Sequence, residues 1–236
     1  MKRILNTLQQ KWPEYLLEIL VITIGILGAF TLNSWSSARE AKDSEALSIT
    51  RLKEDIRSNL DRYEFLKERY RGRIEKSDSI LTLIQQQETV EDRFNFITIN
   101  LIFFYLIEAD VTTYDELVNT GKLYAFSSSS LRSNITFYYL NVKKWSSYVE
   151  KDNNQLREMM IKDQYGPYWT LQESLWEEQE IDLEKFPWVK SRYSEELVQI
   201  EALIRRAREI YRDNLGRTET LERMAQKLLK RLESHR

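Results

Sequence analysis

Residues 15–35 read YLLEILVITIGILGAFTLNSW, the most apolar stretch of a chain of 236 residues. As a helix rising about 1.5 Å per residue, these 21 residues match a hydrocarbon core roughly 30 Å thick. Trp12 and Trp35 flank the stretch and would place one indole ring at each membrane interface. The stretch therefore predicts a single transmembrane helix in contact with a lipid bilayer.

A cleaved signal peptide is the alternative interpretation of the same region. Basic residues precede the apolar run, and the small residues Ser36, Ser37 and Ala38 follow it, as at a cleavage site. Against this, Pro13 and Glu18 interrupt the run, and the polar leader is longer than a signal peptide usually has. A retained membrane anchor is the favoured interpretation.

Basic residues near the span indicate its orientation. Lys2, Arg3 and Lys11 precede it, whereas Arg39 and Lys42 follow it among several acidic residues. Because positive charge is retained on the cytoplasmic side, this bias predicts a cytoplasmic N-terminus, with the residues from Ser36 onward on the other side of the membrane.

Polar and small residues within the span are candidates for oligomerisation. Glu18 lies one turn inside, where an ionisable group is a functional candidate, although it could also reach the headgroups or pair with Lys11. Gly25 and Ala29 form a small-xxx-small pair that lets two helices approach closely. We therefore predict a homo-oligomer and assign the following residues to anchoring or oligomerisation: Trp12, Glu18, Gly25, Ala29, Asn33 and Trp35.

Residues 46–87 follow a heptad pattern that continues outward from the span. The a-type positions are Ile49, Ile56, Tyr63, Tyr70, Ser77 and Ile84, and the d-type positions are Leu52, Asn59, Leu66, Arg73 and Ile80. Leu60, Ile74 and Leu81 widen the apolar stripe on one side, which is typical of a helix that packs against two neighbours. The pattern predicts a long rod in a helical bundle.

Composition supports long helices and restricts the chemistry. The chain has six Gly, three Pro, no Cys and a single histidine, His235. Disulfides, thiolate metal sites and His-dependent triads or zinc sites are thereby excluded. Since phosphate-binding loops, nucleophile elbows and metal-ligand spacings are also missing from the sequence, we expect no catalytic site, metal or cofactor.

Residues 94–107, FNFITINLIFFYLI, form the second most apolar stretch. As a helix they would rise only about 21 Å, too short for a bilayer, so we expect a buried core helix, with a re-entrant hairpin as the alternative.

The residues that follow carry signals for helix ends. Thr113 and Glu116 have the spacing of a capping box, and Gly121 should end the short helix in the left-handed conformation. Four serines, Ser127 to Ser130, then open a helix that reaches about Met160.

Residues 162–193 interrupt this helical pattern. Gly166-Pro167 and Phe186-Pro187 bracket a section rich in aromatic and acidic side chains. Such a surface could bind a cation or the basic face of a partner; alternatively, its rings close the end of the bundle and its acids are solvated. The candidate partner surface comprises Trp169, Trp176, Glu177, Glu178 and Trp188.

Residues 194–236 complete the chain as a heptad helix capped by Ser194, with a break expected at Asn214-Leu215-Gly216. The half beyond Arg205 is basic and could meet lipid phosphates, the acidic section or only solvent. It lacks interleaved aromatics, and the net charge of the chain is −2, so we expect no nucleic-acid partner.

These patterns predict an all-α protein, in which a single N-terminal transmembrane helix continues into a long heptad helix of an extramembrane bundle. The expected organisation is a cytoplasmic leader at 1–14, the span at 15–35, the rod at 36–90, bundle helices at 91–161, the aromatic and acidic excursion at 162–193 and the basic helix at 194–236.

The segments PEYLLEILVITIGILGAFTLNSW, RLKEDI, TYDELVNTGKL and SSLRSNITFYY resemble the bacterial single-pass membrane proteins grouped as domain of unknown function 6090. Thr113, Leu117, Gly121 and Leu123 match the family pattern, whereas Asn33-Ser34 stands where the family usually has two Asn. The resemblance implies a helical protein of the bacterial inner membrane and no particular chemistry. With the charge bias, it predicts a cytoplasmic N-terminus and a periplasmic C-terminal domain.

Function is therefore expected to lie in binding. We expect a membrane-anchored scaffold, accessory or sensor-like protein that acts through self-association or a membrane-protein partner. The alternative is an oligomeric pore or channel-accessory subunit with Glu18 lining one mouth.

Overall fold

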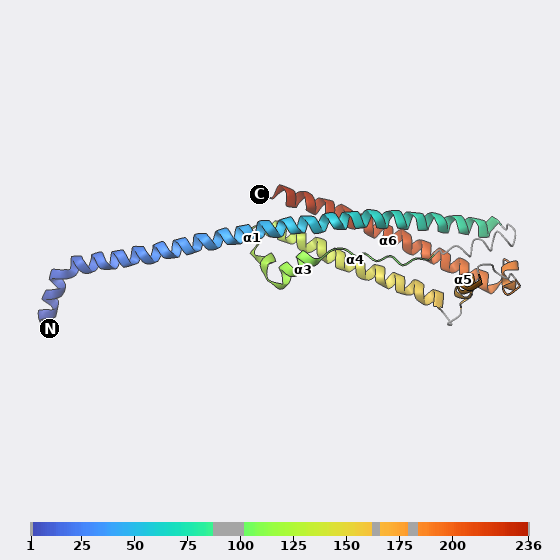
Figure 1. The fold of residues 1–236 in the computed structure, drawn as a ribbon, viewed down its shortest axis with the longest axis horizontal. Helices are drawn as coiled ribbons and strands as arrows, with labels where there is room; N and C mark the ends of the chain where they lie inside the picture. Colours follow the sequence, from blue (N-terminus) through green and yellow to red (C-terminus); the bar gives the residue numbers. More distant parts are fainter. Residues whose placement is uncertain (1, 87–101, 162–165, 179–183, 236) are drawn as a thin grey trace.

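One uninterrupted helix, α1 (Lys2–Gln86), runs the length of the molecule (Figure 1). The computed structural model describes residues 2–86, 102–161, 166–178 and 184–235. No Gly or Pro lies between Gly28 and Gly72, so the residues that most weaken a helix are missing from the stretch that joins span and rod. The apolar stretch at 15–35 therefore passes into the rod as one continuous helix.

The other elements are also helical. They are α3 (Thr112–Asn119), the 3-10 helix η1 (Lys122–Ala125), α4 (Ser129–Ile161), α5 (Pro167–Glu178), the 3-10 helix η2 (Pro187–Lys190) and α6 (Glu195–Ser234). Within the described residues there is no β-strand, and the all-α prediction is confirmed. Helix α6 continues through Asn214-Leu215-Gly216, so the break expected there is wrong.

Three helices form the bundle: the second half of α1, α4 and α6 (Figure 1). Helix α6 is antiparallel to α1, since Arg57 pairs with Glu233 and Asp78 with Arg208. Helix α4 runs in the direction of α1, so its first residues lie at the end of the bundle nearest the span. Helix α6 packs along α1 and α4 packs on α6, whereas the first half of α1 extends beyond the bundle.

The heptad prediction identifies the core of α1. Of the eleven a and d positions from Ile49 to Ile84, only Arg73 is not buried. The facing seam of α6 is buried in the same way, by Leu203, Ala207, Ile210, Leu221, Ala225, Leu228 and Leu232, among others. Burial of such side chains contributes roughly 1.5–3 kcal/mol each, so this seam supplies much of the stability.

The expected core helix at 94–107 is wrong over the part that the structure describes. Residues 102–111 carry neither helix nor strand and run as a drawn-out chain beside the bundle helices (Figure 1), while 94–101 lie outside the described residues. Ile102 and Ile107 are buried in the core, but Leu106 is 44% exposed. An extended chain thus occupies a place in the bundle where a helix was expected.

Local signals at the helix ends gave mixed results. Gly121 adopts the left-handed conformation (φ 73°), and Ser194 caps α6 by accepting a hydrogen bond from the Leu197 amide, as predicted. The capping box of Thr113 and Glu116 is wrong. The Thr113 amide donates to Asp55 of α1, and Glu116 pairs with Arg51 at 2.6 Å, so tertiary partners replace the local cap.

Candidate functional site

The apolar stretch of α1 at 15–35 stands free of the bundle (Figure 1). Every side chain from Leu16 to Asp43 is exposed, and the stretch is long and apolar enough to cross a membrane. A continuous apolar cylinder of this size cannot remain in water without a large free-energy cost. This part of α1 is therefore compatible with a single-pass membrane anchor.

The six residues assigned to anchoring or oligomerisation all lie on this exposed helix: Trp12, Glu18, Gly25, Ala29, Asn33 and Trp35. A Cβ added to Gly25 would meet no other atom within 4 Å, so the groove beside it is open to a second helix. Gly25 and Ala29 are four residues apart and share one face. Their role in oligomerisation stays a prediction.

The most elaborate polar arrangement of the described residues surrounds the extended segment 102–111. Outside a sheet or helix, its backbone groups need other hydrogen-bond partners. Asn59 of α1 is almost fully buried and supplies two of them: its Nδ2 donates to the Asp110 carbonyl at 3.0 Å, and its Oδ1 accepts from the Asp110 amide at 2.5 Å. The side-chain amide thus takes the place of a neighbouring backbone.

Further side chains from all three bundle helices bind the same segment. The hydroxyl of Tyr211 accepts from the Phe103 amide and donates to the Phe103 carbonyl. Four more side chains donate to backbone carbonyls of the segment. Arg62 binds the carbonyl of Leu106, Ser146 binds that of Ile107, and both Asn153 and Tyr70 bind that of Tyr105. The bundle therefore holds the segment mainly through backbone atoms.

Buried tyrosines extend this polar network. The hydroxyls of Tyr63 and Tyr138 are 3.0 Å apart, and Asn59 donates to Tyr138 at 3.3 Å. Burial raises the pKa of Tyr138 to about 12 and that of Tyr63 further still. These phenols therefore stay neutral near pH 7, where they act as hydrogen-bonding groups of the core.

Sequence reasoning missed this network, although one signal pointed to it. Asn59 occupies a d position in a run of apolar residues, where a polar side chain is costly unless it is hydrogen-bonded. Asn153 and Tyr211 had no comparable signal, because their partners lie 48 and 108 residues away in the sequence.

A buried cation lies in the seam between α1 and α6. The side chain of Lys67 is 9% exposed and pairs with Glu222 of α6 at 2.7 Å and with Glu64 of its own helix at 2.6 Å. Hydrogen bonds to the two carboxylates raise the pKa of Lys67. Because Glu64 lies on the same helix as Lys67, Glu222 is the partner through which this cation joins α1 to α6.

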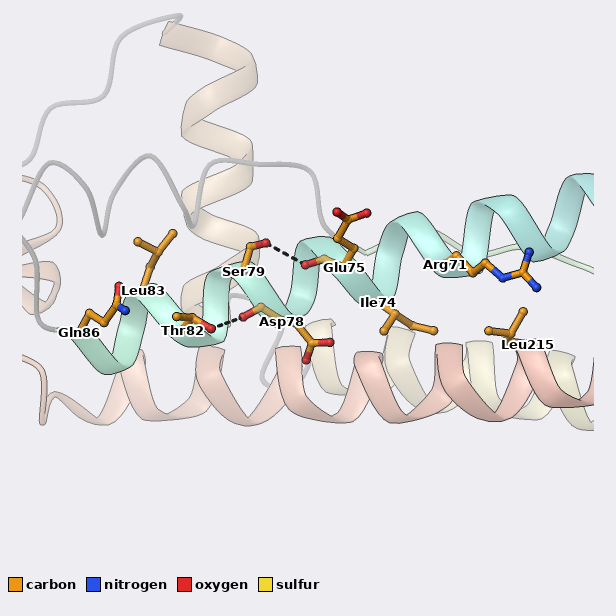
Figure 2. A pocket seen from close by; sticks show the side chains of 9 residues that line it. All are labelled: Arg71, Ile74, Glu75, Asp78, Ser79, Thr82, Leu83, Gln86 and Leu215. Atoms are coloured by element: carbon orange, nitrogen blue, oxygen red, sulfur yellow. Dashed lines mark hydrogen bonds between the residues drawn. The ribbon is translucent and has the colours of Figure 1, made fainter.

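A groove of about 720 Å³ opens between α1 and α6 at the far end of the bundle (Figure 2). Its apolar lining includes Ile74, Leu83 and Leu215. Asp78 is engaged by Arg208 and Arg212, while Ser79 and Thr82 donate to carbonyls of their own helix, as Figure 2 shows. In the described part of the chain, no three acidic or histidine side chains gather as metal ligands.

The aromatic and acidic section contains α5 and η2 at the same end. Trp169 and Trp188 are half-buried against the core, and Trp188 meets Phe186 edge to face at 6.0 Å. Their rings therefore help to close the bundle. Trp176, Glu177 and Glu178 lie in α5, but their side chains lie outside the described set, and the partner surface stays a prediction.

Comparison with known proteins assigns a family. Neither the curated proteins nor the solved structures contain a match to this chain. The profile of a family of unknown function matches residues 18–163, which include most of the span, the rod, the extended segment and the whole of α4. Because this match covers more than half of the sequence, the chain belongs to the family of unknown function DUF6090.

Proposed function

We propose that this protein is a single-pass membrane scaffold or accessory subunit that acts through self-association or a membrane-protein partner, without catalysis. The observation that carries the proposal is the continuity of α1, whose exposed apolar half leads directly into the core of the bundle. A helix of this kind can transmit an axial or rotational displacement from the membrane to the bundle.

The location that we propose is the bacterial inner membrane, as the family resemblance implies. The charge bias supports an N-terminus in the cytoplasm and a bundle in the periplasm. A reporter that is active only in the periplasm, fused after Ser234, tests this orientation. We expect activity with that fusion and none with a fusion before Lys2. The reverse result would place the bundle in the cytoplasm.

Self-association is tested at the small-residue face of the span. Gly25→Leu places a bulky side chain where two helices would approach most closely, so we expect at least a tenfold weaker dimer in a detergent or nanodisc mass measurement. Thr23→Leu is the matched control, because it adds a similar side chain on the opposite side of the same helix.

Equal self-association of wild type, Gly25→Leu and Thr23→Leu would exclude this face as the interface. A monomeric wild type, by crosslinking in cells and by mass, would remove self-association altogether. Planar-bilayer recordings separate the scaffold from the pore: ion conductance that changes in Glu18→Gln would favour the pore instead.

A further inference from the structure

Glu45 lies where α1 first meets the rest of the molecule. All side chains from Leu16 to Asp43 are exposed, and Ser44 and Glu45 are the first to be partly covered. Any movement of the span therefore reaches the bundle through this turn of α1.

Three segments meet at the Glu45 carboxylate. Its Oε2 accepts from the Ser127 amide at 3.1 Å, and its Oε1 accepts from the Ser127 hydroxyl at 3.0 Å, just before α4 begins. Nε2 of His235, the residue after α6, lies 3.3 Å from the same Oε1. The Glu45 side chain is 13% exposed and that of His235 25%, so their contact is partly buried, whereas Ser127 is exposed.

The surroundings of His235 are polar and charged. Glu45, Lys42 and Lys53 of α1 line a cavity of about 280 Å³ with His235, and Ser127 adds an uncharged hydroxyl. On its own helix, Arg231 is one turn away, and Glu233 is engaged by Arg57 at 3.1 Å. Among the residues that the structure describes, Glu45 is thus the carboxylate in direct contact with the imidazole.

We propose that Glu45, Ser127 and His235 form a proton-controlled latch that fastens the end of α6 to α1 and α4 beside the membrane. The charge of an imidazole changes between pH 5 and 8. A protonated ring donates a charge-assisted hydrogen bond to the Glu45 carboxylate, whereas a neutral ring binds it less strongly. The latch closes in acid, loosens as the pH rises and requires neither self-association nor a particular orientation in the bilayer.

Hydrogen exchange of the full chain in nanodiscs tests the latch. After correction for intrinsic exchange, we expect protection of the last two turns of α6 to fall about fivefold between about pH 5.5 and 8, because the charged hydrogen bond is lost. His235→Gln is the matched control, since its amide can still donate to Glu45 but carries no titrating proton. Its protection should be the same at both values.

Glu45→Gln removes the charge that attracts the imidazolium, so protection in acid should fall to the level seen at high pH. Ser127→Ala should weaken the attachment of α4 and leave the pH dependence in place. Unchanged pH dependence in His235→Gln, or equal wild-type protection at both pH values, would overturn the latch.

Discussion

Asn59 holds Asp110 at two points, donating to its carbonyl at 3.0 Å and accepting from its amide at 2.5 Å. Such a pair imitates one rung of a sheet, although the two residues lie on a helix and on an extended chain. It explains how residues 102–111 can lie in a helical bundle without a strand beside them.

Asn59→Leu tests this explanation. The substitution keeps the branched shape of the side chain, with bulkier methyl groups, but leaves the Asp110 amide and carbonyl without these partners. We therefore expect a loss of about 3 kcal/mol in the free energy of unfolding. Denaturant titration of the full chain in mild detergent measures it. Ser58→Ala, at an exposed neighbour, should change stability by less than about 0.5 kcal/mol; an equal loss in both variants would contradict the role of Asn59.

Periodicity predicted the helical part of the fold well. The heptad from Ile49 to Ile84 identified the buried face of α1, and the Ser194 cap and Gly121 marked where elements begin or end. These signals depend on residues close together in the sequence, where local geometry decides the conformation.

The extended segment could not be predicted in the same way. A short apolar run such as IFFYLI at 102–107 fits a buried helix or a strand, and only the aromatic and β-branched content favours the strand. The conformation of this segment depends on hydrogen bonds from side chains of helices that are distant in the sequence, including Asn153 and Tyr211. The capping box predicted at Thr113 is wrong for a related reason. The Thr113 amide binds Asp55 and the Glu116 carboxylate binds Arg51, so neither group is used in a local cap.

Lys67→Met should destabilise the bundle by about 2 kcal/mol. The substitution leaves the Glu222 carboxylate, which is 18% exposed, in the α1–α6 seam without its cation. Thermal unfolding of the full chain, followed by circular dichroism, measures the effect.

The double variant Lys67→Met with Glu222→Leu should recover most of that loss, because an apolar pair of similar size needs no charge compensation. A double variant that is less stable than Lys67→Met alone would show that the ion pair itself, and not the unpaired carboxylate, carries the stability.

Alkaline pH should unfold the bundle steeply. Burial raises the pKa of Tyr138 and Tyr211 from 10.0 to about 12, and it also raises the pKa of Tyr63, Tyr70 and Tyr139. Since the unfolded phenols lose their protons first, the stability present below pH 10 is lost as the pH rises toward 12.

Each tyrosine that ionises only on unfolding removes about 1.4 kcal/mol per pH unit in this range. Ultraviolet titration should show these phenolates appearing together with the loss of helix. Tyr193→Phe, at an 83% exposed position, should leave the transition unchanged, whereas Tyr138→Phe should make it less steep. Phenolate formation well before unfolding would contradict the burial argument.

Two exposed glycines should respond to alanine in opposite directions. Gly121 has φ 73°, a conformation that costs an L-residue about 1 kcal/mol, so Gly121→Ala should destabilise the chain by about that amount. Gly216 lies inside α6, where alanine is the better helix former, so Gly216→Ala should stabilise by about 1 kcal/mol. An added Cβ would meet nothing within 4 Å at either site, so backbone conformation alone separates them, and denaturant midpoints that shift in the same direction would refute the left-handed turn at Gly121.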